Sequence, residues 1–474
     1  MGYISVFDVL KIGVGPSSSH TLGPWKAALQ FLETIAIEEV ESVSVHLFGS
    51  LALTGKGHGT DIAVMMGLSG HDPKVVPVEI VQELPDQIKA SGKLSLGGKN
   101  DIAFDYSHAI QFHFSEQLTL HPNGIRFIAF NQLGAELSRQ TYFSVGGGFV
   151  VHENDMGAEA VSEGINVPYD ITSADDLEAF CMARRMNIAE LAMKNELHIA
   201  AEGQVRGGLN AIWEVMRDCM FRGCHTPGLL PGGLNVRRRA SDIYKKLASE
   251  PRQAANSLEW FQQLQSLQPP FNETLNWISC FAMAINEENA NFGRVVTAPT
   301  NGAAGVIPAV LAYYVLFSGK EVTDAKIQDF LLVCGVIGTL FKNGATISAA
   351  MGGCQAEIGV SSAMAAAALT EGLGGNVGQS LMAAEIAMEH HLGLTCDPVK
   401  GLVQVPCIER NSMGAIKAIT AANLALASDP EKAKVSLDEV IQTMWHTAQD
   451  MHQKYKETSL GGLATNIAVI VPEC

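Results

Sequence analysis

Positive charge is scarce in this chain. It carries 32 Lys and Arg residues against 49 Asp and Glu residues, which gives a formal net charge of −17. Nucleic-acid binding depends on clustered Lys and Arg side chains that release the counterions of the phosphates. We therefore exclude nucleic acid as a partner.

Long apolar runs are also missing. A membrane-spanning helix needs roughly 18 or more apolar residues in succession, whereas the longest candidate, residues 305–319, is short and contains Pro308. The first residues, MGYISVFDVLKIG, contain no basic segment followed by an apolar core, as a secretory signal would. The sequence predicts a cytoplasmic protein without a membrane partner.

Cysteine pairs of the C-x-x-C kind are absent, although the chain has nine cysteines. In a reducing compartment, cysteines that cluster serve as metal ligands or in catalysis more often than in disulfides. Five of the nine lie in apolar or helix-like stretches and are expected to be buried structural residues: Cys181, Cys219, Cys224, Cys280 and Cys334.

The length of 474 residues exceeds what one hydrophobic core usually fills, so we expect two domains. Short, partly alternating apolar runs in the first 150 residues predict strands, interspersed with glycine-rich turns and a helix at 24–37. The strands are expected at 43–47, 75–81, 108–114, 125–130 and 141–151.

From about residue 170 the pattern becomes helical, and Ala-rich stretches follow. Helices are expected at 175–199, 207–222, 361–372 and 413–427. We predict an N-terminal α+β domain (residues 1–155), a polar, acidic linker (156–172) and a mainly α-helical C-terminal domain (173–474) that carries the chemistry of the cysteines.

Four cysteines occur in a different setting from the other five. Cys354 follows two glycines in AAMGGCQAE, while Cys396 and Cys407 bracket TCDPVKGLVQVPC, whose prolines and glycine exclude one continuous helix. Cys474 ends the chain. This spacing is compatible with zinc, with an iron–sulfur cluster or with no metal, and the absence of closely paired thiols favours the cluster over zinc.

Polar groups suited to an anionic ligand lie near the start of the chain. A polar run follows Gly-Pro and leads into the first predicted helix. It consists of Ser17, Ser18, Ser19, His20 and Thr21. Hydroxyls and backbone amides at a helix N-terminus bind anions such as a carboxylate. An ordinary helix cap with spare serines is the alternative.

Two further segments present imidazoles. His58 lies between glycines in GKGHGTD, where Asp61 could orient it, and histidine is the side chain best matched to proton transfer near neutral pH. His121 and Asn123 occupy the turn HPNG, which could equally be a simple β-turn.

A last polar segment lies in the second domain. Thr300, Asn301 and Gly302 precede an apolar helix in TAPTNGAAG and suit a ligand that is held close to the backbone. The Gly-Lys-Ser/Thr ending of a phosphate-binding loop is missing, which excludes that motif.

Taken in order, seven segments give the chain a close resemblance to the bacterial iron–sulfur-dependent L-serine dehydratases, or L-serine ammonia-lyases, of the single-chain form. The resemblance covers essentially the whole chain. The segments are KIGVGPSSSHT, GKGHGTD, HPNGIRF, SVGGGF, VVTAPTNGAAGVIPA, GGCQAEIG and GLTCDPVKGLVQVPCIERN.

The resemblance implies a homodimeric lyase whose β-type and α-type domains meet near a [4Fe–4S] cluster. Cys354, Cys396 and Cys407 match the ligands of three irons. Cys474 is similar to the terminal cysteine that caps the fourth iron until substrate displaces it. Its thiol and free carboxylate correspond to the hydroxyl and carboxylate of serine, although a C-terminal cysteine can also be incidental.

The resemblance further implies that His58 is the catalytic base and that His20, its neighbouring serines, His121 and Asn123 lie near the substrate. In this scheme the open iron polarises the β-hydroxyl of L-serine as a Lewis acid and His58 removes the α-proton. Loss of water gives an enamine, which becomes pyruvate and ammonia.

Three other functions are alternatives to this scheme. A related β-eliminating lyase, for example one that releases sulfide from cysteine, would differ only in its pocket. An iron–sulfur sensor or electron carrier would have four permanent ligands and no need of the His and Ser motifs. A pyridoxal-phosphate enzyme would need a Schiff-base lysine, and neither Lys56 nor Lys342 lies in a phosphate-binding context.

Overall fold

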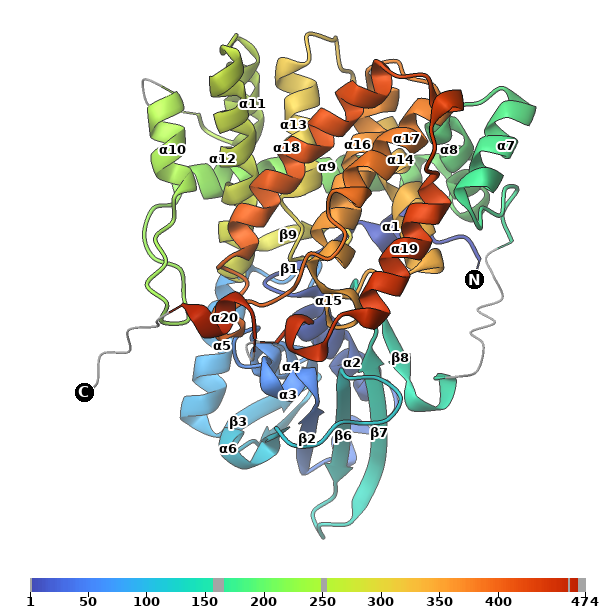
Figure 1. The fold of residues 1–474 in the computed structure, drawn as a ribbon. Helices are drawn as coiled ribbons and strands as arrows, with labels where there is room; N and C mark the ends of the chain where they lie inside the picture. Colours follow the sequence, from blue (N-terminus) through green and yellow to red (C-terminus); the bar gives the residue numbers. More distant parts are fainter. Residues whose placement is uncertain (1, 157–165, 249–253, 459–460, 468–474) are drawn as a thin grey trace.

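The computed structural model describes residues 2–156, 166–248, 254–458 and 461–467. An α+β part formed by the N-terminal third of the chain lies at one end of the molecule and a bundle of helices lies at the other (Figure 1). The predicted order of an α+β domain followed by a mainly α-helical domain is confirmed.

A five-stranded mixed sheet forms the centre of the α+β part. Strand β2 pairs in parallel with β5 and antiparallel with β6, and its residues Val43, Val45 and Leu47 alternate into the core, as half-buried strands require. In sheet order the strands are β5 (Ile110–His113), β2 (Ser42–Phe48), β6 (Gly124–Phe130), β7 (Glu136–Ser144) and β8 (Val150–His152).

Helices and a small hairpin complete this part of the chain. The hairpin consists of β3 (Lys93–Leu96) and β4 (Asn100–Ala103). The helices are α2 (Gly23–Leu32), α3 (Ser50–Leu53), α4 (Thr60–Leu68), α5 (Val78–Ser91) and α6 (Tyr106–Ala109).

One predicted strand is wrong. Residues 75–81 turn and then enter α5, because Pro77 precedes the first helical residue, Val78, and the run VEIVQEL also has helical periodicity. The side chain of Arg294 donates hydrogen bonds to the carbonyls of Pro73 and Val76 and so fixes this turn. The other predicted strand segments overlap β2, β5, β6, β8 and the end of β7.

The first residues of the chain belong to the helical core rather than to the sheet. Val6 and Val9 of α1 (Val6–Val9) are buried in the same hydrophobic cluster as the C-terminal helices. Strand β1 (Lys11–Val14) then pairs antiparallel with β9 (Arg294–Thr297). This pairing places the loop after β1 next to the residues that precede β9, where the amide of Gly15 donates to the carbonyl of Gly293.

The helical part is centred on an Ala-rich helix, α16, which is buried from Ile358 to Thr370 and packs against α13, α14, α17 and α18. The helices of this part are α7 (Ala174–Arg184), α8 (Ile188–Ile199), α9 (Glu202–His225), α10 (Ala240–Leu247), α11 (Ser257–Gln265), α12 (Phe271–Ala290), α13 (Val306–Phe317), α14 (Asp324–Gly344), α15 (Ala349–Gly352), α16 (Ile358–Gly372), α17 (Val377–Glu389), α18 (Cys407–Leu426), α19 (Leu437–Asp450) and α20 (Leu463–Asn466).

The helix expected at 175–199 is interrupted. Helix α7 ends at Arg184, because the next residue, Arg185, has a φ of 54° in the left-handed region, and α8 begins after Asn187. Asn187 and Glu190 form a capping box, which satisfies the free amides of the new helix and therefore favours a break over continuation.

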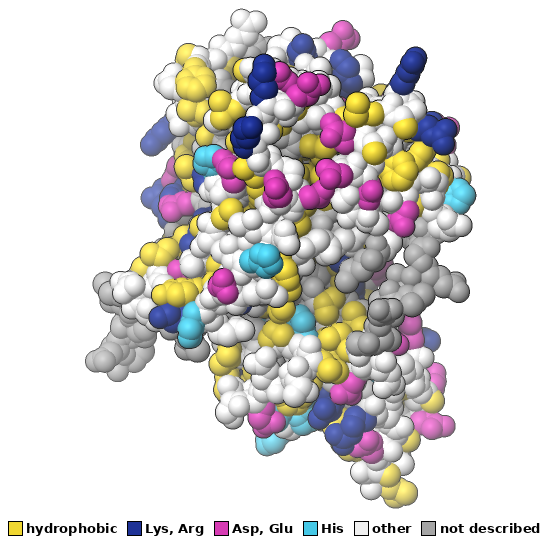
Figure 2. All heavy atoms as spheres, turned by 45° about the vertical axis from the view of Figure 1, so that its right-hand side comes forward, with side chains coloured by type: hydrophobic (Ala, Val, Ile, Leu, Met, Phe, Trp, Pro, Cys, Tyr) yellow, Lys and Arg dark blue, Asp and Glu magenta, His cyan; other side chains and the backbone are white. Residues whose placement is uncertain are grey.

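Among the described residues, no single helix has both the length and the apolar composition of a membrane span. Only the bent pair formed by residues 324–344 and 349–356, with an angle of 53° between its halves, passes such a test when taken together. On the face drawn in Figure 2, acidic and basic side chains of the described residues intermingle rather than forming one basic field.

Candidate active site

A small cavity lies at the junction of the two parts. Both parts of the chain contribute to its wall, and the residues carry thiol, imidazole, hydroxyl and carboxyl groups. The lining residues are Pro16, Ser17, His58, Gly302, Glu357, Cys396, Pro398, Val403, Cys407 and Glu457.

Two of the four cysteines predicted as ligands, Cys396 and Cys407, line this cavity, and Cys354 lies beside Cys396. Cys354, Cys396 and Cys407 are buried, free thiols, and Cys407 is the first residue of α18. The Cys354 and Cys396 sulfurs and a Glu357 carboxyl oxygen all lie within 4.8 Å of one another. Sulfur donors of this kind suit a soft metal ion or an iron–sulfur group.

A positive charge stabilises the thiolate form at this site. The guanidinium of Arg410 donates a hydrogen bond to the Cys354 sulfur at 3.2 Å and pairs with Asp397 at 3.1 Å. A hydrogen bond from the Cys396 thiol and the charge of Arg410 lower the pKa of Cys354 to about 7, against the opposing effect of burial. Since the thiolate is the ligand form of cysteine, Cys354 is prepared for metal binding.

Gly353 allows the Cys354 turn to approach the Cys396 loop. Its φ is +72°, and an added Cβ would lie 2.8 Å from the carbonyl oxygen of Leu394. We expect Gly353→Ala to lower the midpoint of thermal unfolding, with a cost of about 1–3 kcal/mol. Gly374→Ala is the matched control because its φ is also positive, at +102°, but nothing lies within 4 Å of the added Cβ. Equal midpoints for the two variants would contradict this close approach.

His58 has the tautomer of a base. Its Nδ1 lies 3.0 Å from the carbonyl oxygen of Thr54, which can only accept, so Nδ1 carries the proton and Nε2 keeps its lone pair. Burial, and then the neighbouring His20, lower the pKa of His58 to about 4. The imidazole is therefore neutral near pH 7. The expected orientation by Asp61 is wrong, because that carboxylate accepts hydrogen bonds from Tyr106 and Lys89 instead.

The serine-rich loop folds against His58, as a short π-helical turn (Ser18–Leu22) that continues into α2. The Thr21 hydroxyl donates to the carbonyl of His58 at 2.7 Å, and the imidazoles of His20 and His58 are stacked with centroids 4.6 Å apart. Ser17 caps the turn by accepting from the amide of His20 and also lines the cavity. Ser18 and Ser19 are buried beside it.

The HPNG turn lies on the other side of His20. The Pro122 carbonyl accepts from the amide of Ser50, whose hydroxyl is 2.9 Å from Nε2 of His20. Burial lowers the pKa of His121 to about 4, with Glu457 and His20 acting as the nearby charges. The Asn123 amide nitrogen donates to the carbonyl of Ser144, while its buried Oδ1 has no partner among the described residues.

In the TAPTNG segment, one residue lines the cavity and another connects the segment to β1. The amide of Asn301 donates to the carbonyl of Val14 and to Asn289, so it joins β1 to this loop. Thr300 is buried, and its hydroxyl has no hydrogen-bond partner among the described residues. Gly302 lines the cavity, and an added Cβ there would lie 2.8 Å from a Glu357 carboxyl oxygen.

The structure adds residues that the sequence did not indicate. Glu457 lies beside Ser19 and His20, from which it is separated by more than 430 residues of chain. Glu357 and Arg410 are near Cys354. The sequence contains a signal for Arg410, because this residue follows Cys407 by about one helical turn in the PCIERN segment. Cys474 lies outside the described residues.

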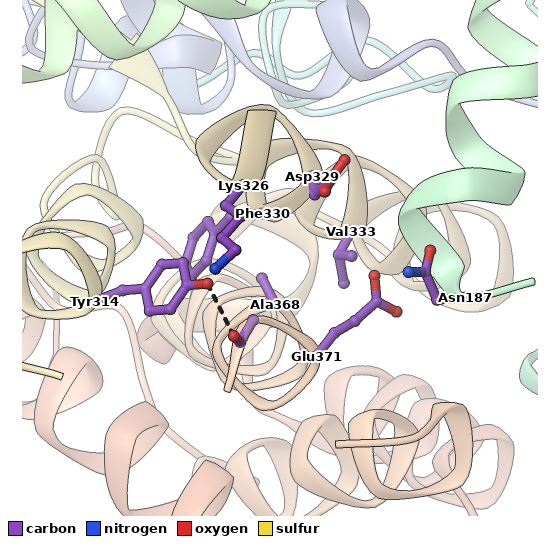
Figure 3. Close-up of a pocket in the computed structure, with 9 residues that line it drawn as sticks. Asn187, Tyr314, Lys326, Asp329, Phe330, Val333, Ala368 and Glu371 are labelled. Carbon is purple, nitrogen blue, oxygen red and sulfur yellow. Dashed lines mark hydrogen bonds between the residues drawn. The ribbon is translucent and has the colours of Figure 1, made fainter. Parts of the chain in front are cut away.

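A second hollow lies on the helical part and is drawn in Figure 3. Tyr314 donates to the carbonyl of Gly372, and Glu371 accepts from the first amides of α8. Its lining residues include neither cysteine nor histidine, and Asp329, Lys326 and Asn187 complete its polar wall. These groups perform helix capping and packing, so the junction cavity remains the candidate active site.

Comparisons with known proteins agree with this division of the chain. The family model described as serine dehydratase beta chain matches residues 5–155, and the one described as serine dehydratase alpha chain matches residues 183–464. An L-serine dehydratase of Streptomyces coelicolor is 49% identical over 98% of this chain and 99% of its own length. L-serine dehydratase 2 of Escherichia coli is 46% identical over the same shares, and an L-serine dehydratase of Mycobacterium tuberculosis is 47% identical over 99% and 100%.

Proposed function

The chain belongs to the serine dehydratase family, and from this we propose that it is an L-serine ammonia-lyase that converts L-serine into pyruvate and ammonia. The observation that carries the proposal is the junction cavity. It brings buried thiols, a neutral histidine and the serine-rich loop to one place, although these groups come from both ends of the chain.

We assign a [4Fe–4S] cluster to the three thiols. The chemistry of the donor set fits this group, since Cys354, Cys396 and Cys407 are sulfur donors without disulfide partners and Arg410 offsets part of the negative charge of the thiolates. Three thiolates would hold three irons of such a cluster, and when bound it would supply a Lewis acid for the substrate hydroxyl.

The proposal includes Cys474 as a cap of the open iron in the resting state. The amide of Leu463 donates to the Asp397 carboxylate at 2.7 Å, so the final segment begins next to the Cys396 loop. Eleven residues (474 − 463) can extend over roughly 35 Å. Their length therefore supports the assignment of the terminal thiol to this site.

His58 takes the α-proton of the bound substrate through Nε2, because Nδ1 is held by the carbonyl of Thr54. The electron pair of the C–H bond becomes the new double bond as the C–O bond breaks, and the departing hydroxide receives the proton held by His58 and leaves as water. The resulting enamine tautomerises and is hydrolysed to pyruvate and ammonia. The loop of Ser17 to Thr21 is assigned to the substrate carboxylate.

The same family membership extends the proposal to a cytoplasmic homodimer. Sedimentation of the purified holoenzyme measures the assembly. A monomer at assay concentration would remove this part of the proposal without affecting the reaction.

Pyruvate formation from L-serine by anaerobically purified protein tests the function. Iron and sulfide are counted in the same sample, before and after exposure to air, and L-threonine and L-cysteine are assayed in parallel. We expect activity with L-serine that follows about four irons per chain and declines in air. Full activity without iron would overturn the cluster assignment, and exclusive release of sulfide from L-cysteine would indicate the related lyase.

The pH dependence of kcat/KM provides a second test. Because the pKa of His58 is lowered to about 4, the base stays unprotonated as the pH falls through 6.5 and is lost only near pH 4. The unfolded chain takes up this proton at higher pH, so the same shift weakens folding below about pH 6.5. Samples incubated at each pH and assayed at pH 7.5 separate the two effects. A reversible loss of activity centred near pH 6.5 would contradict the assignment.

A further inference from the structure

Two carboxyl groups line the cavity, those of Glu357 and Glu457. Glu357 lies against the thiols, with one oxygen 3.9 Å from the Cys354 sulfur, whereas no part of the proposed reaction uses Glu457. Glu457 is 4% exposed and lines the cavity together with Ser17 and His58. Its Oε1 accepts from the hydroxyl of Ser19 at 3.3 Å and pairs with Nδ1 of His20 at 3.2 Å. Its Oε2 is buried without a hydrogen-bond partner among the described residues.

The backbone holds this side chain in place. The carbonyl of Tyr455 accepts from the amide of Cys396, and Lys456 forms a β-bridge with Cys396. Glu457 itself has a φ of 51°, in the left-handed region that a residue other than glycine seldom adopts. Such a conformation persists only where the surrounding structure enforces it, and it is most common at functional sites.

A buried carboxylate oxygen without a partner is costly, so it calls for a donor from the ligand. Two nearby donors are already engaged, because His20 faces Oε1 and Arg410 is directed at Cys354 and Asp397. The substrate has three polar groups. The hydroxyl and the carboxylate are assigned to the cluster and to the serine-rich loop, which leaves the α-ammonium group.

We propose that Glu457 binds the α-ammonium group of the substrate through Oε2 and thereby makes the site selective for amino acids over acids without an amine. This inference rests on the proposed function and deepens it. Ser19 and His20 then act as positioning residues, because they orient the carboxylate through Oε1.

The test compares two ligands that differ only in the α-amine, L-cysteine and 3-mercaptopropanoate, in wild-type holoenzyme and in Glu457→Gln. Affinities are measured by inhibition of L-serine turnover and, independently, from the change in cluster absorbance. We expect wild type to bind L-cysteine about 10- to 100-fold more tightly than 3-mercaptopropanoate. The variant should lose most of this difference while its affinity for 3-mercaptopropanoate stays within about threefold, because the amide cannot bind a cation as a carboxylate does.

Two further variants make the result specific. Glu196→Gln is the matched control, because Glu196 is 1% exposed and accepts from Tyr3, Ser5 and the amide of Val6 outside the cavity. It should retain the full discrimination. Glu457→Asp keeps the charge on a shorter side chain, so it should prefer L-cysteine over 3-mercaptopropanoate more strongly than Glu457→Gln does. If Glu457→Gln fails to fold, Glu457→Asp takes its place in the comparison.

Retained discrimination in Glu457→Gln, or an equal loss of affinity for both ligands, would overturn the inference. Equal losses would mean that Glu457 only supports the loop. An inactive wild type would instead refute the proposed function, and the absorbance measurement would still report on Glu457.

Discussion

Replacement of His58 by glutamine is expected to reduce kcat by about 10²- to 10⁴-fold while the iron content stays that of the wild type. Glutamine has no group that accepts a proton near neutral pH, but it preserves polarity and approximate length. The environment already favours the neutral imidazole, because Nδ1 donates to the carbonyl of Thr54 and burial disfavours the charged form. Single-turnover kinetics with L-serine and iron analysis of the same sample measure the two quantities.

His391→Gln is the matched control for this change. His391 is also buried, its Nδ1 lies 2.6 Å from the carbonyl oxygen four residues earlier, and its pKa is likewise lowered to about 4, mainly by burial. It does not line the cavity. The control should therefore show near wild-type turnover. A His58→Gln variant that is as active as the control would remove His58 from the reaction.

Replacement of Cys396 by serine is expected to abolish turnover and to reduce bound iron to a small fraction. The serine hydroxyl stays protonated at neutral pH and is a poor ligand for iron, whereas thiolates hold iron–sulfur clusters. Cys396 is central to the site, because its sulfur lies within 4.8 Å of the Cys354 sulfur and its backbone amide binds the carbonyl of Tyr455. Iron and sulfide analysis of anaerobically prepared protein gives the measurement.

Cys334→Ser controls for the loss of a buried thiol. Cys334 is fully buried in α14, where its sulfur lies 3.6 Å from the carbonyl oxygen of Met364, and a serine hydroxyl can make the same hydrogen bond. Its iron content and activity should match the wild type. If Cys396→Ser kept its iron as well, Cys396 could not be a ligand, and the donor set would have to be assigned anew.

Some features followed from local sequence and others did not. The segment from Cys396 to Cys407 was expected to avoid a continuous helix, and the structure places a short 3-10 turn (Val399–Gly401) there, with α18 beginning at Cys407. The apolar pattern at 75–81 fitted a strand and a helix equally, and packing of α5 on α4 decided in favour of the helix. Periodicity over so few residues cannot distinguish the two.

The sequence by itself determined the fold class, the buried thiols and the polar loops, because periodicity, glycine placement and side-chain chemistry are properties of short segments. Tertiary structure alone decided which of these groups meet. In the folded chain, Glu457 contacts Ser19 and His20. The Asp61 carboxylate accepts hydrogen bonds from Tyr106 and Lys89, and His58 is oriented by the carbonyl of Thr54 instead. Such contacts leave no local pattern, since they depend on the pairing of β1 with β9 and on the return of the chain near its end to the Cys396 loop.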